Sequence, residues 1–274
     1  MLKRIIPSSG ELLPVVGLGT WKQFDVDLSV TDKEPLSEVL QLMAQQGGTL
    51  IDSSPMYGKS EEVIGALTKE LSNRDDFFYA TKVWTTGAKS GIQQMESSMR
   101  KMNRKTMDLI QVHNLMDYKT HLKTLRQWKE EGKIRYIGIT HYTSSAHEEL
   151  ENIIKSEKID FVQFNYSIRV RNAETRLLRI AKDKGIAVII NEPFEKGDLF
   201  RIIKDKQLPE WCTDYEIENW AQFFLKYIIS HPAVNCVIPA TSNPSHSTQN
   251  VKAGIGILPD EKGRLKMVQF IKDV

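Results

Sequence analysis

A carboxylate, a phenol, an ammonium group and an imidazole stand at Asp52, Tyr57, Lys82 and His113. Tyrosine has an ordinary pKa of about 10, which is too high for efficient proton transfer at neutral pH, and a neighbouring ammonium lowers that pKa. An aspartate paired with the lysine would hold the ammonium in place and compensate its burial. A histidine can hydrogen-bond a substrate oxygen and orient it. If the fold brings the four side chains together, they predict acid–base catalysis at a substrate oxygen.

Three of these residues end or follow a short apolar run, and Tyr57 lies on the small-residue turn after the first run. The three runs cover residues 50–51, 77–81 and 107–112. In a parallel α/β protein the carboxyl ends of the strands meet at the ligand site, so Asp52, Lys82 and His113 would share a pocket. Each also has a structural explanation: a capping aspartate in a turn, an ion pair at the rim, and a hydrogen-bonded histidine. Their occurrence at three successive strand ends favours the catalytic interpretation.

Strand and helix patterns alternate along the chain and define the scaffold for these residues. Eight short apolar segments are expected as strands, at residues 15–19, 49–51, 77–81, 107–112, 134–139, 161–164, 186–190 and 235–238. Helices are expected at residues 36–46, 60–71, 91–101, 121–131, 144–156, 174–184, 216–230, 244–253 and 260–272. This alternation implies parallel strands joined by right-handed crossovers, and eight units fit the size of a (β/α)8 barrel.

The predicted fold class is therefore α/β, a (β/α)8 TIM barrel with an N-terminal β-hairpin at residues 2–13 and a short C-terminal helix. Residues 1–274 are expected to form a single domain, and residues 191–215 an irregular insert. A doubly wound open sheet is the rival fold. Its nucleotide fingerprint G-x-G-x-x-G is absent, because residues 17–21 (Gly-Leu-Gly-Thr-Trp) lack the third glycine.

Composition excludes several classes of protein. The chain has 274 residues, 41% hydrophobic, and a net charge of +2 with both signs interspersed, so no nucleic-acid footprint is expected. Two cysteines give neither a disulfide framework nor a metal-ligand spacing, and the six histidines show no ligand spacing, so no metal is expected. Neither a signal peptide nor an apolar run of about 20 residues is found, which predicts a cytoplasmic protein without a membrane span.

Four segments in the first half of the chain resemble the aldo-keto reductases. They are residues 17–21, 51–58, 81–84 and 108–113, in the order and spacing of that family. The second half matches more loosely, at residues 136–141, 161–167, 238–242 and 249–250. The resemblance implies that Asp52, Tyr57, Lys82 and His113 are the family's catalytic tetrad. It also implies NADPH-dependent reduction of a small-molecule carbonyl to an alcohol without a metal, with Tyr57 as the proton donor.

The resemblance further implies a set of cofactor contacts. These are Gly19, Thr20, Trp21, Thr140, His141, Gln163, Asn191, Pro193, Phe194, Pro239, Ala240, Thr241, Ser242, His246, Gln249 and Asn250. Three departures from the family matter. Asn191 replaces an aromatic residue that stacks on the nicotinamide, Ala240 and His246 replace the cations that grip the 2′-phosphate, and Gln249 replaces the usual nearby glutamate. Phosphate recognition relies on charge-assisted hydrogen bonds, so we expect NADPH to be preferred by a reduced margin, with NADH possible.

The substrate pocket implied by the family is lined by Trp21, Met56, Trp84 and His113. Such an apolar cleft suits aromatic or aliphatic aldehydes. The long C-terminal loop of many relatives is missing, so an open site with broad specificity is expected, with the insert 191–215 supplying part of a lid. Glu192 is unusual beside a pyrophosphate, and it is expected to face solvent or to pair with Arg169, Arg171 or Lys196.

Two other functions remain open from the sequence. The first is a cofactor-binding sensor or regulatory subunit on the same fold, since fold does not fix function and the cofactor motifs depart from the family. The second is a hydrolase or lyase barrel, which the lack of a second carboxylate at the site disfavours. The intact tetrad favours the reductase.

Overall fold

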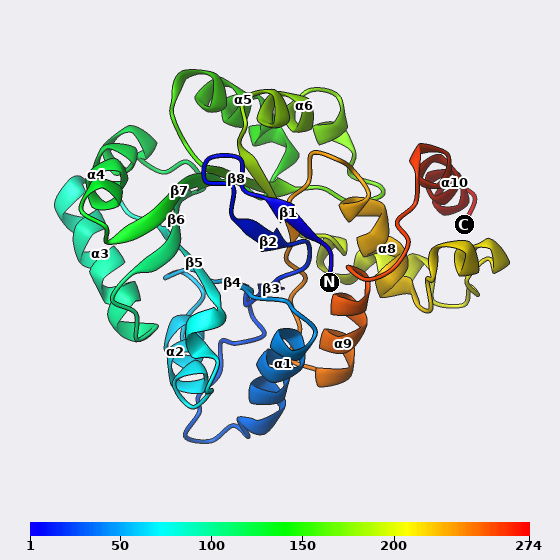
Figure 1. Cartoon of the computed structure of the whole chain (residues 1–274), viewed down its shortest axis with the longest axis horizontal. Coiled ribbons are helices and arrows are strands. Elements are labelled where there is room, and N and C mark those ends of the chain that lie inside the picture. Colours follow the sequence, from blue (N-terminus) through cyan, green and yellow to red (C-terminus); the bar gives the residue numbers. More distant parts are fainter.

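Eight parallel strands form a barrel in the computed structural model, which describes residues 1–274. In chain order they are β3 (Leu18–Gly19), β4 (Leu50–Asp52), β5 (Phe78–Val83), β6 (Met107–His113), β7 (Ile134–Thr140), β8 (Phe161–Asn165), β9 (Ala187–Asn191) and β10 (Cys236–Val237). Each strand pairs with the next, and bridges from Val16 to Val237 and from Gly19 to Ala240 join the last strand to the first. The predicted (β/α)8 barrel is confirmed (Figure 1).

Helices surround this barrel on the outside (Figure 1). They are α1 (Glu34–Gln45), α2 (Ser60–Lys69), α3 (Ala88–Lys101), α4 (Tyr118–Glu130), α5 (His147–Ser156), α6 (Leu177–Asp183), α7 (Asp198–Ile202), α8 (Trp220–Ile229), α9 (Pro244–Lys252) and α10 (Glu261–Lys272). Short 3-10 turns lie at Arg74–Asp76, Ser144–Ala146, Asn172–Glu174, Glu195–Gly197 and Glu210–Tyr215. No helix is both long and apolar enough to cross a bilayer.

Two predictions about this part of the chain are wrong in detail. The insert 191–215 is not irregular throughout, because it contains α7 and two 3-10 turns. The helix expected at residues 216–230 begins only at Trp220. Glu216 has a left-handed backbone with φ of 53°, and the Asn219 side chain accepts a hydrogen bond from the Gln222 amide, which caps the helix at this point.

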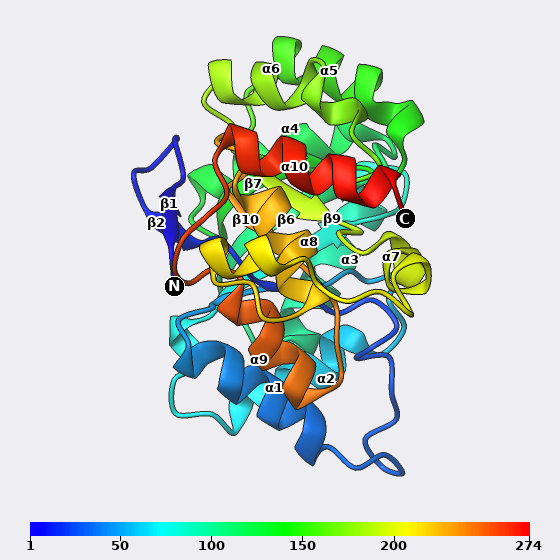
Figure 2. The same cartoon turned by 90° about the vertical axis from the view of Figure 1, so that its right-hand side faces the viewer.

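The N-terminal hairpin closes one end of the barrel. Its strands β1 (Lys3–Ile5) and β2 (Leu12–Pro14) pair antiparallel, as predicted. Ile6 and Leu13 are buried among side chains of the barrel interior, in a cluster of 12 residues that is distinct from the 60-residue core between strands and helices. The hairpin and α7 lie at opposite ends of the barrel (Figure 2).

The barrel interior changes from apolar to polar along the strands. Side chains two residues apart on a strand point to the same face. Leu109 on β6 belongs to the interior cluster, so Gln111 and His113 further along β6 also point inward. On other strands, Leu50, Ala80, Phe161 and Ile189 also belong to the interior cluster. The residues two positions after them are Asp52, Lys82, Gln163 and Asn191, which therefore point inward as well. A polar layer therefore fills the end of the barrel opposite the hairpin.

A buried lysine without an acidic partner fastens α8 to the segments around it. Lys226 is fully buried, and its Nζ donates to the carbonyl oxygens of Tyr215 at 2.7 Å, Ile255 at 3.0 Å and Ile257 at 2.9 Å. Burial lowers the pKa of this lysine. One ammonium thus satisfies three otherwise unpaired carbonyl groups. A buried charge usually needs such hydrogen-bond partners.

Candidate active site

The polar layer contains a buried ion pair between Asp52 and Lys82. Lys82 Nζ lies 2.5 Å from Asp52 Oδ2 and 2.7 Å from the Ser53 carbonyl oxygen, and both side chains are buried. Burial lowers the pKa of Lys82, but the charges of Asp52 and Tyr57 outweigh it and the net direction is upward. The lysine is therefore a fixed ammonium at neutral pH, as the sequence predicts.

The second carboxylate oxygen of Asp52 is held by two glutamines. Gln111 Nε2 donates to Oδ1 at 3.2 Å and Gln163 Nε2 donates to it at 3.0 Å. Gln163 Oε1 in turn accepts from Thr140 Oγ1 at 3.2 Å and from Asn191 Nδ2 at 3.3 Å. Asp52 is the acceptor at the centre of this network, which fixes the direction in which it presents its charge to Lys82.

Tyr57 covers the ion pair from the loop after β4. Lys82 Nζ lies 5.0 Å from the centre of the Tyr57 ring. Burial raises the pKa of Tyr57 and the Lys82 ammonium lowers it, and the net direction is upward. The net lowering predicted from the sequence is therefore wrong, although Lys82 acts in the expected sense. Desolvation of the phenol exceeds the effect of an ammonium whose charge is already paired with Asp52. Tyr57 is consequently protonated at neutral pH.

His113 stands beside Tyr57 and is held by the turn after Asp52. The rings of Tyr57 and His113 meet edge to face, with centroids 5.8 Å apart, and Ser54 Oγ lies 2.9 Å from His113 Nδ1. Burial and the charge of Lys82 lower the pKa of His113 to about 2. The imidazole is therefore neutral and available as a hydrogen-bond donor or acceptor. All four predicted catalytic residues meet at one end of the barrel.

Three apolar side chains on the segments that follow β3, β4 and β5 remain partly open to solvent. Trp21, Met56 and Trp84 are 40%, 38% and 37% exposed, which is unusual for such large side chains. The Trp84 ring lies 6.5 Å from that of His113. Gln94 on α3 holds the backbone of Trp84 by accepting from its amide at 2.6 Å and donating to its carbonyl oxygen at 3.1 Å. An apolar surface therefore adjoins the polar cluster, as expected for a pocket that binds an organic molecule.

Some residues expected to contact a cofactor instead use their side chains within the protein. The Thr20 hydroxyl donates to the Asp52 carbonyl oxygen at 3.0 Å. Thr140 and Gln163 bond to each other, and both are buried. The ring of Phe194 packs against Phe200, with centroids 4.9 Å apart. The side chains of Thr20, Thr140 and Gln163 are therefore held within the protein, whereas that of Phe194 is half-buried.

Other expected cofactor residues remain open at the carboxyl ends of the strands. Asn191 ends β9, and its Oδ1 is buried without a hydrogen-bond partner. The second group lies at the start of α9, where Asn243 caps the helix and Ala240, Ser242 and His246 are exposed. Gly19, Pro239, Thr241 and Asn250 are buried in or beside this region, whereas Pro193 is buried next to Glu192 and His141 and Gln249 are half-buried.

Glu192 follows Asn191 in a left-handed conformation with φ of 49°. Its Oε1 lies 3.3 Å from Lys196 Nζ, which confirms one of the three partners expected from the sequence. Arg169 pairs with Glu195, and Arg171 pairs with Glu174. Glu192 also acts to raise the pKa of Tyr57, so its charge is felt at the catalytic cluster.

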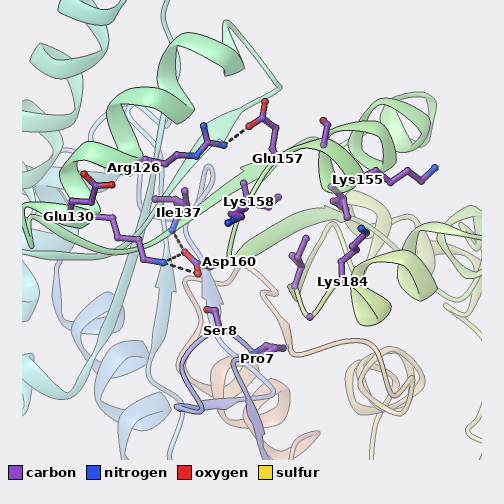
Figure 3. A pocket seen from close by; sticks show the side chains of 16 residues that line it. Pro7, Ser8, Arg126, Glu130, Ile137, Lys155, Glu157, Lys158, Asp160 and Lys184 are labelled. Carbon is purple, nitrogen blue, oxygen red and sulfur yellow. Dashed lines mark hydrogen bonds and ion pairs between the residues drawn. The ribbon is translucent and has the colours of Figure 1, made fainter.

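A hollow of about 930 Å³ lies at the hairpin end of the barrel, opposite this cluster, and Figure 3 shows the side chains that line it. It is bordered by the hairpin residues Pro7 and Ser8 and by the segment before β8. Two ion pairs lie at its border, because Lys129 Nζ lies 2.7 Å from Asp160 and Arg126 pairs with Glu157, and Glu130, Lys158 and Lys184 also line it. The hollow is thus a salt-bridged gap between α4, α5 and α6.

Sequence reasoning missed Gln111, Ser54 and Asn165. Gln111 and Asn165 are polar residues at inward positions of β6 and β8, two residues from an expected site residue on the same strand. His147 Nε2 lies 3.0 Å from Asn165 Oδ1, so this amide is tied to α5. A strict count of alternate positions from Leu109 would have found Gln111. No sequence pattern points to the contact of Ser54 with His113, because it depends on the path of the turn.

A (β/α)8 barrel with acid–base groups at the carboxyl ends of its strands has the architecture of a barrel enzyme. The family model described as "Aldo/keto reductase family" matches residues 15–265. The chain therefore belongs to the aldo/keto reductase family.

Individual relatives agree with this assignment. The chain is 27% identical to methylglyoxal reductase YeaE of Escherichia coli (strain K12) over 259 residues, which cover 91% of this chain and 89% of YeaE. It is 28% identical to aldo-keto reductase YhdN of Bacillus subtilis (strain 168) over 190 residues, or 64% of this chain and 56% of YhdN. The fold is similar to that of an aldo-keto reductase from Klebsiella pneumoniae in complex with NADPH, with a TM-score of 0.81, 22% identity and coverage of 99% of this chain and 95% of the other.

Proposed function

We propose that this protein is an NAD(P)H-dependent carbonyl reductase that converts aldehydes or ketones to alcohols, with Tyr57 as the proton donor. The observation that carries the proposal is the meeting of Tyr57, His113 and the Asp52–Lys82 pair at one end of the barrel. This arrangement supports proton transfer to a substrate oxygen and offers no second carboxylate for hydrolysis of a glycosidic bond.

The four residues have separate roles in the proposed reaction. Tyr57 and His113 both direct hydrogen-bonding groups toward the carbonyl oxygen of the substrate, and Tyr57 gives its phenolic proton to that oxygen as negative charge develops there. Lys82 stabilises the phenolate that remains, since its ammonium lies beside the Tyr57 ring. Asp52 is a positioning residue that holds Lys82 and balances its charge.

Nicotinamide dinucleotide is the proposed cofactor, and when bound it supplies the hydride for the carbonyl carbon. Two features of the chain fit this group. The unpaired Oδ1 of Asn191 offers an acceptor for a carboxamide N–H, and the exposed side chains of Ser242, Ser245 and His246 around the start of α9 offer hydrogen-bonding groups for a phosphate. Ser242 and His246 would meet a 2′-phosphate without a lysine or arginine at Ala240, so we propose NADPH as the preferred cofactor by a small margin, with NADH accepted.

Small aldehydes are the proposed substrates. The exposed rings of Trp21 and Trp84 and the Met56 side chain provide apolar contacts around the oxygen-binding groups. The similarity to YeaE, whose name is methylglyoxal reductase, also supports a small dicarbonyl as a substrate.

α10 packs against α8, with Phe270 and Trp220 stacked at 6.0 Å, so the helix contributes to the outer wall of the barrel.

The direct test is to follow NADPH absorbance with nitrobenzaldehyde and methylglyoxal. We expect turnover by the wild type and a loss of at least about 100-fold in kcat for Tyr57→Phe, which removes the general acid. Tyr118→Phe is a matched control on α4, outside the cluster, and it should retain wild-type kcat. Tight NADPH binding without turnover would contradict the reductase and favour a cofactor-binding sensor or regulatory subunit.

A further inference from the structure

Ser54 holds the inner nitrogen of His113 in a fully buried contact. Ser54 has no exposed surface, and its Oγ lies 2.9 Å from His113 Nδ1. The same oxygen accepts a hydrogen bond from the Met56 amide at 3.3 Å. His113 Nε2 makes no hydrogen bond within the chain and is not among the buried atoms that lack a partner, so it is the ring nitrogen that faces the cleft.

Hydrogen bonding leaves one consistent arrangement of protons. Ser54 Oγ carries one proton, and within its reach the only acceptor is His113 Nδ1. If His113 Nδ1 carried the ring proton instead, Ser54 Oγ would accept from both His113 and Met56, and its own proton would be buried without an acceptor. Buried hydroxyl protons without partners are costly, so the hydroxyl donates and Nδ1 accepts.

We propose that Ser54 is a positioning residue that fixes His113 as the tautomer protonated at Nε2, so that the imidazole presents an N–H group to the substrate oxygen. The catalytic consequence rests on the proposed function, whereas the tautomer itself does not. In the opposite tautomer, Nε2 would present a lone pair and repel the oxygen as charge builds up on it. Ser54 therefore converts a neutral imidazole into a dedicated donor beside the Tyr57 hydroxyl.

Nuclear magnetic resonance of the imidazole nitrogens reads the tautomer directly. The full chain is labelled with 15N-histidine, two-bond 1H–15N correlations are recorded at pH 7, and His113 is assigned by its absence in His113→Asn. We expect the wild type to show a protonated Nε2 and an unprotonated Nδ1 for this residue. Protonation at Nδ1 in the wild type would overturn the proposal without the need for any variant.

Variants then test whether Ser54 is the cause. Ser54→Ala should shift the His113 nitrogens toward a mixture of tautomers, and Ser54→Thr, which keeps the hydroxyl, should retain the wild-type pattern. Ser98→Ala is a matched control, because it also removes a buried hydroxyl, one that donates to Glu61 at 3.0 Å. An unchanged His113 spectrum in Ser54→Ala would refute the role of Ser54.

Kinetics separate this inference from the proposed function. Ser54→Ala should lower kcat/KM for aldehyde reduction about tenfold, the effect of weakening one hydrogen bond in the transition state, and should leave the Kd of NADPH unchanged. A wild type with the expected tautomer but no turnover would overturn the reductase and leave the assignment of Ser54 intact. A wild type that reduces aldehydes but carries the His113 proton on Nδ1 would overturn the assignment of Ser54 and leave the reductase intact.

Discussion

The buried pair of Asp52 and Lys82 makes a quantitative prediction about stability. Lys82 is fully buried and Asp52 is 2% exposed, so removing either partner leaves the other charge with almost no solvent. We expect Asp52→Leu and Lys82→Met each to lower the free energy of unfolding by about 3–5 kcal/mol. The double variant removes both charges, and its main remaining cost is the unpaired amides of Gln111 and Gln163, about 1–3 kcal/mol each.

The double variant should therefore be far more stable than the sum of the single losses predicts, with a coupling energy of about 3 kcal/mol or more. Urea unfolding monitored by tryptophan fluorescence and far-UV circular dichroism measures all four proteins. The pKa of Lys82 is raised in the fold, so this stabilisation is fully present below the ordinary lysine pKa of about 10.4 and is lost as the pH rises through the folded value. Measurements at pH 6 and pH 8 should agree.

An exposed ion pair provides the control. Lys33 and Glu70 are 2.9 Å apart but 43% and 60% exposed, and the same cycle with Lys33→Met and Glu70→Leu should give a coupling below about 1 kcal/mol. Additive losses for Asp52 and Lys82, or an equal coupling at the surface pair, would refute the argument from burial.

Three further predictions follow from other parts of the molecule. Lys226→Met should lower the free energy of unfolding by about 3 kcal/mol in urea, because it strands three carbonyl groups, whereas the exposed Lys252→Met should change it by less than about 0.5 kcal/mol. The kcat for aldehyde reduction should stay level from about pH 5 to pH 9, since the pKa of Tyr57 is raised above its ordinary value and that of His113 lies at about 2; a fall in kcat on acidification with a midpoint near about 6.5 would show that the histidine titrates normally. Gly138→Ala should cost about 1–3 kcal/mol, because its Cβ would stand 2.7 Å from a backbone oxygen of β8, and an unchanged urea midpoint would contradict this.

Much of the fold was predictable from the sequence because each strand of a barrel is covered on both sides. Runs such as residues 186–190 are continuously apolar, and the intervening helices end at glycines such as Gly132 and Gly185, which have positive φ. The ends of the elements were less predictable. The start of α8 depends on the Asn219 cap and on the backbone of Glu216, which are properties of one turn and leave no periodic signal.

For the site, the positions of Asp52, Lys82 and His113 were predictable because each ends or follows an apolar run. The electrostatic balance at Tyr57 was not, because it depends on how far the phenol is desolvated relative to the pull of Lys82. The role of Gln111 also required the strand register, since only an inward-pointing amide at that level of β6 can reach Asp52. The order of strands in the sequence shows which side chains lie at the same end of the barrel, whereas the extent of their burial decides whether they are protonated.

The bridges that close the barrel can form only late in the synthesis of the chain on the ribosome. Val16 pairs with Val237 and Gly19 with Ala240. The strand at the start of the barrel therefore cannot pair with the last strand until nearly the whole chain has been synthesised. Until then the growing sheet has two open edges, and such edges pair readily with other chains. Closure of the barrel after translation therefore competes with the addition of a strand from a neighbouring nascent chain to the open edges. Slowing elongation before residue 237 should favour aggregation, even though the finished barrel exposes no strand edge.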